Sequence, residues 1–273
     1  MTNPRADRVK AVRALTGRSA RRRSGTFLVE GPQAVREAVA PGGPRVHDLY
    51  LTADAAARYP EIVAAARETG VRLRTGTVEV LDAMSPDAQG VVAVVDQTHG
   101  DLADVLAAGP RLVAVLAHVR DPGNAGAVLR AADAAGADAV VVSAASVDVH
   151  NPKVVRSTAG SLFHLPVVTG PELADVVTAL RAAGLAVLAA DGSGTHDLDD
   201  LLDVAGAAPA GVPDLAAPTA WVFGNEAWGL RDEDVTLADA VVRVPLRGRA
   251  ESLNLATAAT VCLYASGRAQ RGR

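Results

Sequence analysis

Cysteine is almost absent from this sequence of 273 residues, since Cys262 is the only one. A single cysteine excludes an intrachain disulfide and a metal cluster held by several thiolates, and it is typical of a cytoplasmic protein. The sequence also lacks an uninterrupted apolar run of about 18 residues, so we expect no membrane span. Its first residues lead into charged side chains rather than an apolar stretch, so we expect no secretory signal. The histidines lack the spacing of metal ligands, and we expect no metal site.

The sequence has little net charge, −4 at pH 7, but this charge is unevenly distributed. Residues 1–24 contain eight Lys or Arg and one Asp, and residues 243–273 contain six Arg and one Glu, so the segment between them carries −16. Basic ends on an acidic body can bind phosphates locally despite the negative total. The charge pattern alone fits two disordered, solvated arms equally well.

The chain has ample apolar material for a core, with 49% hydrophobic residues, and its elements alternate in the manner of an α/β fold. We predict a smaller N-terminal α/β domain over residues 1–96 and a linker over the polar, Asp- and Ala-rich residues 97–110. The first domain is predicted to start with a basic helix over residues 5–15. Its predicted strands are 26–30, 46–52, 71–74 and 90–95, and its further helices are 33–40, 53–69 and 78–84.

The alternation restarts in a second domain, residues 111–273. Its predicted strands are 112–117, 139–143, 165–169, 185–190, 220–223 and 241–244. Because these runs are apolar almost throughout, they indicate a parallel sheet covered by helices on both faces.

A first polar motif follows the strand that ends at residue 117. Asp121 and Pro122 are suited to start a helix, and the helix would carry Asn124, Gly126 and Arg130. The backbone N–H groups at such a helix start can receive an anion or a polar edge. Taken alone, the segment fits an ordinary capped turn equally well.

A second motif runs from Phe223 to Leu230 after another strand. Gly224 would lie at the carboxyl end of that strand, where ligands bind in open α/β sheets, and would let a ligand approach the backbone. Glu226 would stand at the mouth of the cleft. A glycine-flanked turn with an exposed glutamate is the plain alternative.

A third motif contains Val244, Leu246, Ser252, Leu253 and Asn254, and it opens a helix that extends to about residue 267. Ser252 is suited to cap this helix and Asn254 to lie in its first turn. Capping before a core helix would explain both residues without a ligand.

Together the three motifs, in this order and spacing, resemble those of the SpoU family in the SPOUT superfamily of knotted methyltransferases. The first resembles the family pattern Asn-x-Gly-x-x-x-Arg, the second Phe-Gly-x-Glu-x-x-Gly-Leu, and the third Val-Pro followed by Ser-Leu-Asn. The resemblance covers residues 110–267. More weakly, residues 27–96 resemble the family's RNA-binding domain. Within the family, the sequence is most similar to ribosomal RNA modifiers of the thiostrepton-resistance type.

This resemblance implies an enzyme that transfers a methyl group from S-adenosylmethionine to the ribose 2′-hydroxyl of a nucleotide in structured RNA, with 23S rRNA as the expected substrate. It implies a SPOUT-type parallel sheet with a deep trefoil knot. It also implies a homodimer with the site at the subunit interface. The residues it assigns to the cofactor are Gly224, Val244, Leu246, Ser252, Leu253 and Asn254. The residues it assigns to catalysis are Arg130, Asn124, Glu226, Ser252 and Asn254.

The helix from residue 253 to 265 offers a face of mostly small residues for close packing in such a dimer: Leu255, Ala259, Cys262 and Leu263. The resemblance makes Arg130 the principal catalytic residue. A guanidinium is a poor base because it stays protonated in proteins, so we favour a role in which its charge lowers the pKa of the 2′-hydroxyl and holds the adjacent phosphate. Arginine as the general base stays open.

Three other functions fit parts of the sequence. The substrate could be tRNA rather than rRNA, and a non-catalytic RNA-binding or ribosome-assembly protein would show a similar fold. The segment from Ala190 to Gly194 also resembles the Asp-x-Gly-x-Gly cofactor loop of Rossmann-type methyltransferases. That loop should follow the first strand of the sheet, whereas several predicted strands precede it here.

Overall fold

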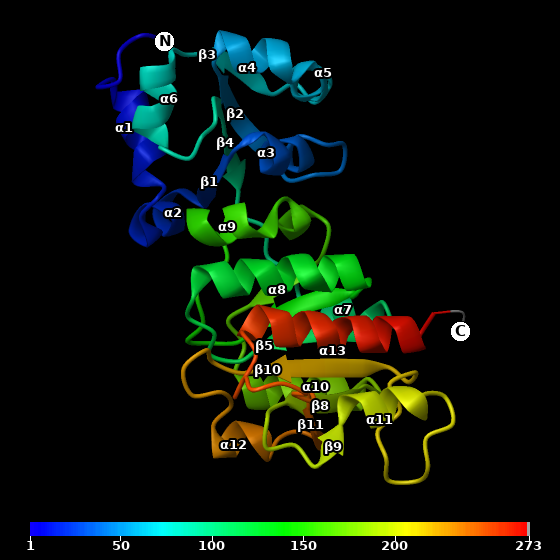
Figure 1. Ribbon diagram of the computed structural model, residues 1–273. Coiled ribbons are helices and arrows are strands. Elements are labelled where there is room, and N and C mark those ends of the chain that lie inside the picture. Colours follow the sequence, from blue (N-terminus) through cyan, green and yellow to red (C-terminus); the bar gives the residue numbers. More distant parts are fainter. Residues whose placement is uncertain (272–273) are drawn as a thin grey trace. The chain divides into compact units, whose positions relative to one another are not determined.

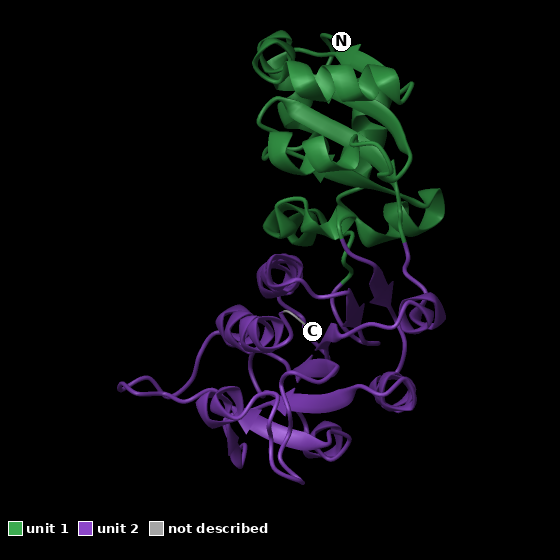
Figure 2. Ribbon diagram, turned by 90° about the vertical axis from the view of Figure 1, so that its right-hand side faces the viewer, with its two compact units in different colours: residues 1–98, 148–164 green, residues 99–147, 165–273 purple. Residues whose placement is uncertain are grey.

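The computed structural model describes residues 1–271 and divides into two compact units (Figure 2). Unit 1 contains residues 1–98 and 148–164, and unit 2 contains residues 99–147 and the chain from Leu165 onward. The chain therefore leaves unit 2 after Val147 and returns to it at Leu165. Figure 1 gives the labels of the elements.

A mixed four-stranded sheet forms the centre of unit 1. Its strands, in spatial order, are β1 (Thr26–Glu30), β4 (Val91–Asp96), β2 (Val46–Leu51) and β3 (Arg72–Thr75). Strand β4 is antiparallel to both of its neighbours, and β2 and β3 are parallel. The helices are α1 (Asp7–Ala14), α2 (Arg18–Ser24), α3 (Pro32–Ala38), α4 (Ala53–Arg58), α5 (Pro60–Glu68), α6 (Val78–Met84), α9 (Pro152–Thr158) and the 3-10 turn η1 (Ser161–Phe163).

The basic N-terminal segment is folded rather than a solvated arm. Val9, Val12 and Leu15 are buried in one apolar cluster with Tyr50 and Met84. Helix α2 was not predicted, because its residues include four arginines and offer no apolar periodicity. The buried residue of this helix is an arginine rather than an apolar residue.

That arginine, Arg21, is only 2% exposed. Its Nη2 lies 2.7 Å from the Asp148 carboxylate, and its Nη1 donates to the carbonyl oxygens of Leu15 and Thr16. Burial alone would raise the pKa of Asp148, but the hydrogen bonds and charge of Arg21 outweigh it and hold that pKa below its usual value. The pair ties α2 to the start of the inserted segment, residues 148–164.

We expect Arg21→Ala to lower the free energy of unfolding by about 3–5 kcal/mol, because the variant leaves a partly buried carboxylate without its cation. Arg22→Ala, an exposed neighbour in the same helix, should change it by less than about 0.5 kcal/mol. Because the folded-state pKa of Asp148 is depressed, its contribution is present above the unfolded value of 3.8 and is lost as pH falls below it. Urea denaturation at pH 7 and at pH 3 measures both effects, and equal losses at the two pH values would contradict the assignment.

The rest of the inserted segment packs on unit 1 as well. Arg156 forms ion pairs with Glu30, which is buried in β1, and with Asp87. The rings of His150 and Phe163 lie 4.7 and 6.3 Å from the ring of Phe27, centroid to centroid. Residues 148–164 therefore belong to unit 1 by packing.

Seven strands, all paired in parallel, form the sheet of unit 2. In spatial order they are β7 (Val167–Thr169), β6 (Ala139–Val142), β5 (Leu112–Leu116), β10 (Thr219–Phe223), β8 (Ala186–Ala190), β11 (Ala240–Arg243) and β9 (His196–Asp197). The helices are α7 (Leu102–Ala107), α8 (Pro122–Ala135), α10 (Leu173–Ala182), α11 (Leu198–Asp203), α12 (Asp232–Val235) and α13 (Leu255–Ala269). The predicted parallel sheet is confirmed.

Helices α8 and α13 pack side by side (Figure 1). A Cβ atom at Gly267 would lie 2.5 Å from the carbonyl oxygen of Ala135, so only glycine permits this approach. Ala259, Cys262 and Leu263 are buried inside the protomer, and burial raises the pKa of the Cys262 thiol to about 12. The expectation that this face of the helix packs in a dimer is therefore wrong, since it packs on its own chain.

Several element boundaries differ from the prediction for local reasons. The predicted helix 53–69 is two helices, because Pro60 starts a new one after Tyr59. The predicted linker 97–110 contains α7, which Asp101 caps by accepting from the backbone N–H of Ala103. Among residues 1–271, none of the helices is long and apolar enough to span a membrane, and no cluster of side chains is suited to hold a metal ion.

Candidate functional site

The register of the parallel sheet brings the polar loops of unit 2 to one edge. Phe223, the last residue of β10, pairs with Leu116 at the end of β5 and with Ala190 at the end of β8. Val242 of β11 also pairs with Ala190. The loops that follow these four strands therefore start level with one another, at the carboxyl edge where open α/β sheets bind ligands.

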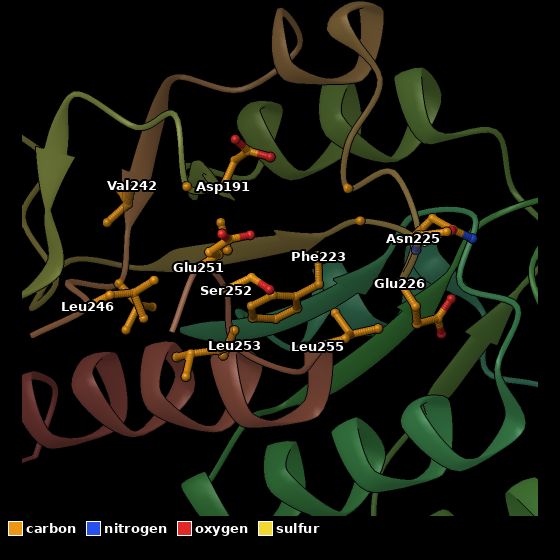
Figure 3. Close-up of a pocket in the computed structure, with 17 residues that line it drawn as sticks. Asp191, Phe223, Asn225, Glu226, Val242, Leu246, Glu251, Ser252, Leu253 and Leu255 are labelled. Atoms are coloured by element: carbon orange, nitrogen blue, oxygen red, sulfur yellow. Dashed lines mark hydrogen bonds between the residues drawn. The ribbon is translucent and has the colours of Figure 1, made fainter. Parts of the chain in front are cut away.

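A cavity of about 330 Å³ lies at this edge, among the ends of β8, β10 and β11 and the start of α13 (Figure 3). Figure 3 shows Val242 and Leu246 toward one end of it and Asn225 and Glu226 toward the other, with Ser252 between them. Its lining residues are Ala190, Asp191, Gly192, Phe223, Gly224, Asn225, Glu226, Ala227, Gly229, Val242, Val244, Leu246, Glu251, Ser252, Leu253, Leu255 and Ala258.

Six of the residues singled out from the sequence line this cavity: Gly224, Glu226, Val244, Leu246, Ser252 and Leu253. Asn124, Arg130 and Asn254 do not line it. The structure thus joins the second and third motifs in one wall, and it connects the first motif to them through hydrogen bonds.

Gly224 is required by its own loop. A Cβ atom there would lie 2.3 Å from the carbonyl carbon of Gly229 and 2.5 Å from the nitrogen of Leu230. The close approach that we expected a ligand to make is made by the protein backbone. Gly224 therefore shapes the cavity by allowing the loop to fold back on the strand end.

Glu226 joins the second motif to the first. Its carboxylate accepts hydrogen bonds from the backbone N–H groups of Asp121, at 3.1 Å, and Arg120, at 3.3 Å. The side chain of Asn225 donates to the carbonyl oxygen of His118 at 2.8 Å. Two adjacent residues of one loop thus hold the backbone of the other, so these hydrogen bonds give Glu226 a positioning function.

The first and third motifs meet through two asparagines. Asn254 caps α13 by accepting from the backbone N–H groups of Ala256 and Thr257, and its Nδ2 donates to Oδ1 of Asn124 at 3.0 Å. Asp121 caps α8 by accepting from the backbone N–H of Asn124 at 2.8 Å. The starts of both helices are therefore fixed to each other by side-chain hydrogen bonds.

Arg130 lies on α8, six residues beyond Asn124, with an exposed side chain. Its guanidinium forms no ion pair or hydrogen bond with residues 1–271. An exposed arginine without such a partner is available for an anionic ligand.

The loop after β5 is also held by charge. Arg231 forms a bidentate ion pair with Asp234, and its Nη2 lies 2.7 Å from Nε2 of His118. Burial alone would raise the pKa of Asp234, but the hydrogen bonds and charge of Arg231 hold it below its usual value. This network fixes His118, whose backbone has a positive φ of 56°.

Sequence reasoning missed Asp191 as a site residue. Asp191 follows β8 directly and lines the cavity, and its Oδ1 accepts from the backbone N–H and the hydroxyl of Ser193. The segment from Ala190 to Gly194 around it matches the Asp-x-Gly-x-Gly loop only in its Gly-x-Gly, and it suggested only a Rossmann fold. That interpretation is wrong, because β8 follows β5, β6 and β7 in unit 2 and is not the first strand of the sheet.

Two family models match the chain. Residues 111–264 match the SpoU rRNA Methylase family, and residues 28–99 match the family described as RNA 2′-O ribose methyltransferase substrate binding. The chain belongs to the SpoU rRNA methylase family. The resemblance deduced from the three motifs is thereby confirmed, and both units contain a matched segment.

Two individual rRNA methyltransferases are similar to this protein over almost its whole length. The 23S rRNA (uridine(2479)-2′-O)-methyltransferase of Streptomyces viridochromogenes is 33% identical, and the alignment covers 97% of this chain and 95% of that protein. The 23S rRNA (guanosine(2553)-2′-O)-methyltransferase of Bacillus subtilis is also 33% identical, with 94% of each chain covered.

Two solved structures agree with the fold. An AdoMet-bound rRNA methyltransferase from Sinorhizobium meliloti has a TM-score of 0.82 and 29% identity, covering 98% of this chain and 97% of that one. The SpoU methyltransferase AviRb from Streptomyces viridochromogenes, in complex with AdoMet, has a TM-score of 0.79 and 33% identity, covering 96% and 98%.

Proposed function

We propose that this protein methylates the ribose 2′-hydroxyl of one nucleotide in 23S rRNA. Membership of the SpoU family makes the chain an S-adenosylmethionine-dependent RNA 2′-O-methyltransferase. The observation that carries the proposal is the cavity at the strand ends, since two of the three family motifs line it and the third is hydrogen-bonded to them. The relatives named above support 23S rRNA as the substrate. A cytoplasmic location follows from such a substrate, and fractionation of cells tests it.

The cavity fits S-adenosylmethionine in size and in the chemistry of its lining. Its volume lies within the range of about 300–1,000 Å³ that is usual for small-ligand sites. We propose that Val244, Leu246 and Leu253 hold the adenine by apolar and backbone contacts, with Gly224 and Ser252 shaping the same wall. Asn254 acts from outside the cavity, because it caps the helix that begins beside it. The carboxylates of Glu226 and Asp191 supply negative charge that suits a sulfonium. When bound, the cofactor supplies an activated methyl group.

The protein itself must orient the ribose and manage one proton. We propose that Arg130 is the principal catalytic residue. Its positive charge stabilises the alkoxide that develops as the 2′-hydroxyl proton passes to solvent water, and it holds the neighbouring phosphate. Asn124 and Asn254, bonded to each other at the helix starts, set the position of the loop before Arg130.

Mapping of 2′-O-methyl marks in total RNA tests the function directly. Cells that lack the protein should lose one mark in 23S rRNA, and the purified protein should restore it in the presence of S-adenosylmethionine. Loss of a mark in tRNA would overturn the rRNA assignment. Loss of no mark, with cofactor binding intact, would favour a non-catalytic RNA-binding or assembly function.

We also propose that unit 1 selects the RNA. Its helices α1 and α2 carry four exposed arginines with no ion pair or side-chain hydrogen bond to residues 1–271: Arg13, Arg18, Arg22 and Arg23. Exposed guanidinium groups without carboxylate partners are suited to bind phosphates.

Replacing these four arginines with glutamine should weaken RNA binding and flatten its dependence on salt. The slope should fall by about 0.7–0.9 for each phosphate that the variant no longer neutralises. Binding curves at several salt concentrations measure this slope. The substitution is sharper than deletion of residues 1–24, because deletion would remove Val9, Val12 and Leu15 from the core. A matched control replaces Arg58 and Arg67, exposed on other helices of unit 1. An unchanged slope in the fourfold variant would show that these arginines are only solvated.

A homodimer is proposed on the outer face of α13. Val261 and Tyr264 are 40% and 44% exposed there, and they are one turn apart between Thr257 and Arg268. Two neighbouring exposed apolar side chains on a helix favour a protein contact. Sedimentation at micromolar concentration should show a dimer for the native protein and a monomer for Val261→Asp with Tyr264→Asp, and a monomeric native protein would refute the proposal.

The deep trefoil knot also remains a proposal. Strand β11 lies between β8 and β9, which precede it in the chain, and a Cβ atom at Gly194 would lie 2.6 Å from the backbone nitrogen of Arg243. This insertion of a late strand beside an earlier tight loop supports threading. A crystal structure traced through residues 190–255 tests it.

A further inference from the structure

The two tryptophans of the protein have opposite environments. Trp221, in β10, is fully buried, and its Nε1 donates to the hydroxyl of Ser266 at 2.9 Å. Trp228, in the loop after the same strand, is 50% exposed. Only 3% of the residues are aromatic, so an exposed indole at this position is a rare feature of the molecule.

Arg120 lies over the ring of Trp228. Its guanidinium carbon is 5.2 Å from the centroid of the indole ring, the distance of a cation–π contact. Arg120 is exposed, and its guanidinium has no ion pair or hydrogen bond with residues 1–271. The pair thus combines a flat aromatic surface with an uncompensated positive charge.

Backbone contacts hold both side chains in place. Asn225 and Gly229 exchange two backbone hydrogen bonds, of 2.8 and 2.9 Å, and these close the loop that carries Trp228. The carboxylate of Glu226 accepts from the backbone N–H of Arg120. The loops that carry the two residues are therefore fixed relative to each other before any ligand binds.

The same contacts place this pair beside the candidate site. Arg120 precedes Asn124 by four residues in the first motif, and Trp228 follows Glu226 by two residues in the second. Ala227 and Gly229, on either side of Trp228, line the cavity, whereas Trp228 itself does not. The pair lies outside the proposed cofactor cavity: Trp228 belongs to a loop that lines it, and Arg120 to the loop whose backbone Glu226 holds.

We propose that Trp228 and Arg120 form a stacking platform for an unpaired RNA base adjacent to the ribose that is methylated. The proposal rests on the proposed function, and it adds a site for the substrate. A ribose 2′-hydroxyl reaches a site of this kind in an unpaired or splayed stretch of RNA, whose bases stack on aromatic rings and on arginine planes. The indole would receive the base, and the guanidinium the phosphate beside it.

Three proteins and an unmodified 23S rRNA transcript test the platform. In the native protein, addition of the transcript should quench the fluorescence of the exposed Trp228. Trp228→Phe keeps an aromatic face, so it should methylate the transcript almost normally. Because only the buried Trp221 fluoresces in this variant, the transcript should not quench its fluorescence. Trp228→Ala should raise the KM for RNA about tenfold or more, the loss expected for one base stack. Its kcat, S-adenosylmethionine affinity and melting temperature should be unchanged.

Other outcomes would overturn the platform. If Trp228→Ala has the same KM for RNA as the native protein, no base stacks at this position. Weaker S-adenosylmethionine binding in this variant would make Trp228 a cover of the cofactor cavity, and a change in sedimentation would make it a contact between two copies. If the transcript quenches the tryptophan fluorescence of the native protein but is never methylated, the platform stands and the 23S rRNA assignment fails. The two proposals are therefore tested separately.

Discussion

Replacing Arg130 with alanine is expected to lower the single-turnover methylation rate by about 10²–10³-fold, the usual effect of removing one group that stabilises developing negative charge. The affinity for S-adenosylmethionine should not change, because Arg130 does not line the cavity. The fold should also be unaffected, since the side chain is exposed and forms no ion pair or hydrogen bond with residues 1–271. Single-turnover assays with saturating RNA, together with calorimetric titration of the cofactor, measure the two quantities.

Two further variants separate the functions of this arginine. Arg130→Lys keeps a positive charge, and we expect it to retain a larger share of the rate than alanine does. If lysine is as inactive as alanine, the planar geometry of the guanidinium matters more than its charge. Arg58→Ala, which removes an exposed arginine from a helix of unit 1, is the matched control and should have nearly the native rate at saturating RNA. A native rate in Arg130→Ala would show that another residue activates the hydroxyl.

Gly224→Ala is expected to disrupt the cofactor site and to destabilise the protein. The new Cβ would meet the backbone of Gly229 and Leu230 at 2.3–2.5 Å, and backbone atoms cannot move aside as a flexible side chain can. Such overpacking costs about 1–3 kcal/mol of stability. Because the displaced loop also carries Asn225 and Glu226, we expect the affinity for S-adenosylmethionine to fall by about tenfold or more, since each 1.4 kcal/mol is a factor of ten.

Gly248→Ala is the matched control for this substitution. Gly248 belongs to the loop between β11 and α13, which also lines the cavity, but a Cβ atom there would meet nothing within 4 Å. Its melting temperature and cofactor affinity should match those of the native protein. If Gly224→Ala also binds the cofactor normally, the cavity at the strand ends is not the cofactor site.

Most strands of unit 2 could be predicted from the sequence, because a buried parallel strand is an apolar run bounded by polar loops. Strand β9 could not, since it has only two residues, His196 and Asp197, and no apolar signal. Helix α2 was missed because Arg21 occupies its buried position, and the ion pair with Asp148 that permits this is 127 residues away in sequence. The spatial order of the strands depends on such long-range pairings and has no local signal.

The candidate site, like the fold, could be predicted only in part from the sequence. Resemblance identified the motif residues, but it did not show that Gly224 is needed by the backbone of its own loop, or that Glu226 holds the loop after β5. Asp191 was missed as a cavity residue because its place depends on β8 lying next to β10. Trp228 stood in a variable position of the second motif, where the pattern gives no reason to notice it.

The excursion of residues 148–164 into unit 1 determines how the protein can be divided experimentally. A fragment that starts at residue 99 would keep α9 and η1 but lack β1 and α3, and Val154, Val155 and Leu162 would then be without the neighbours that bury them. A soluble catalytic fragment therefore requires a second change, a short polar connection in place of residues 148–164. By the same reasoning, an exchange of unit 1 between relatives must transfer two separate stretches of sequence, one from each side of the first motif.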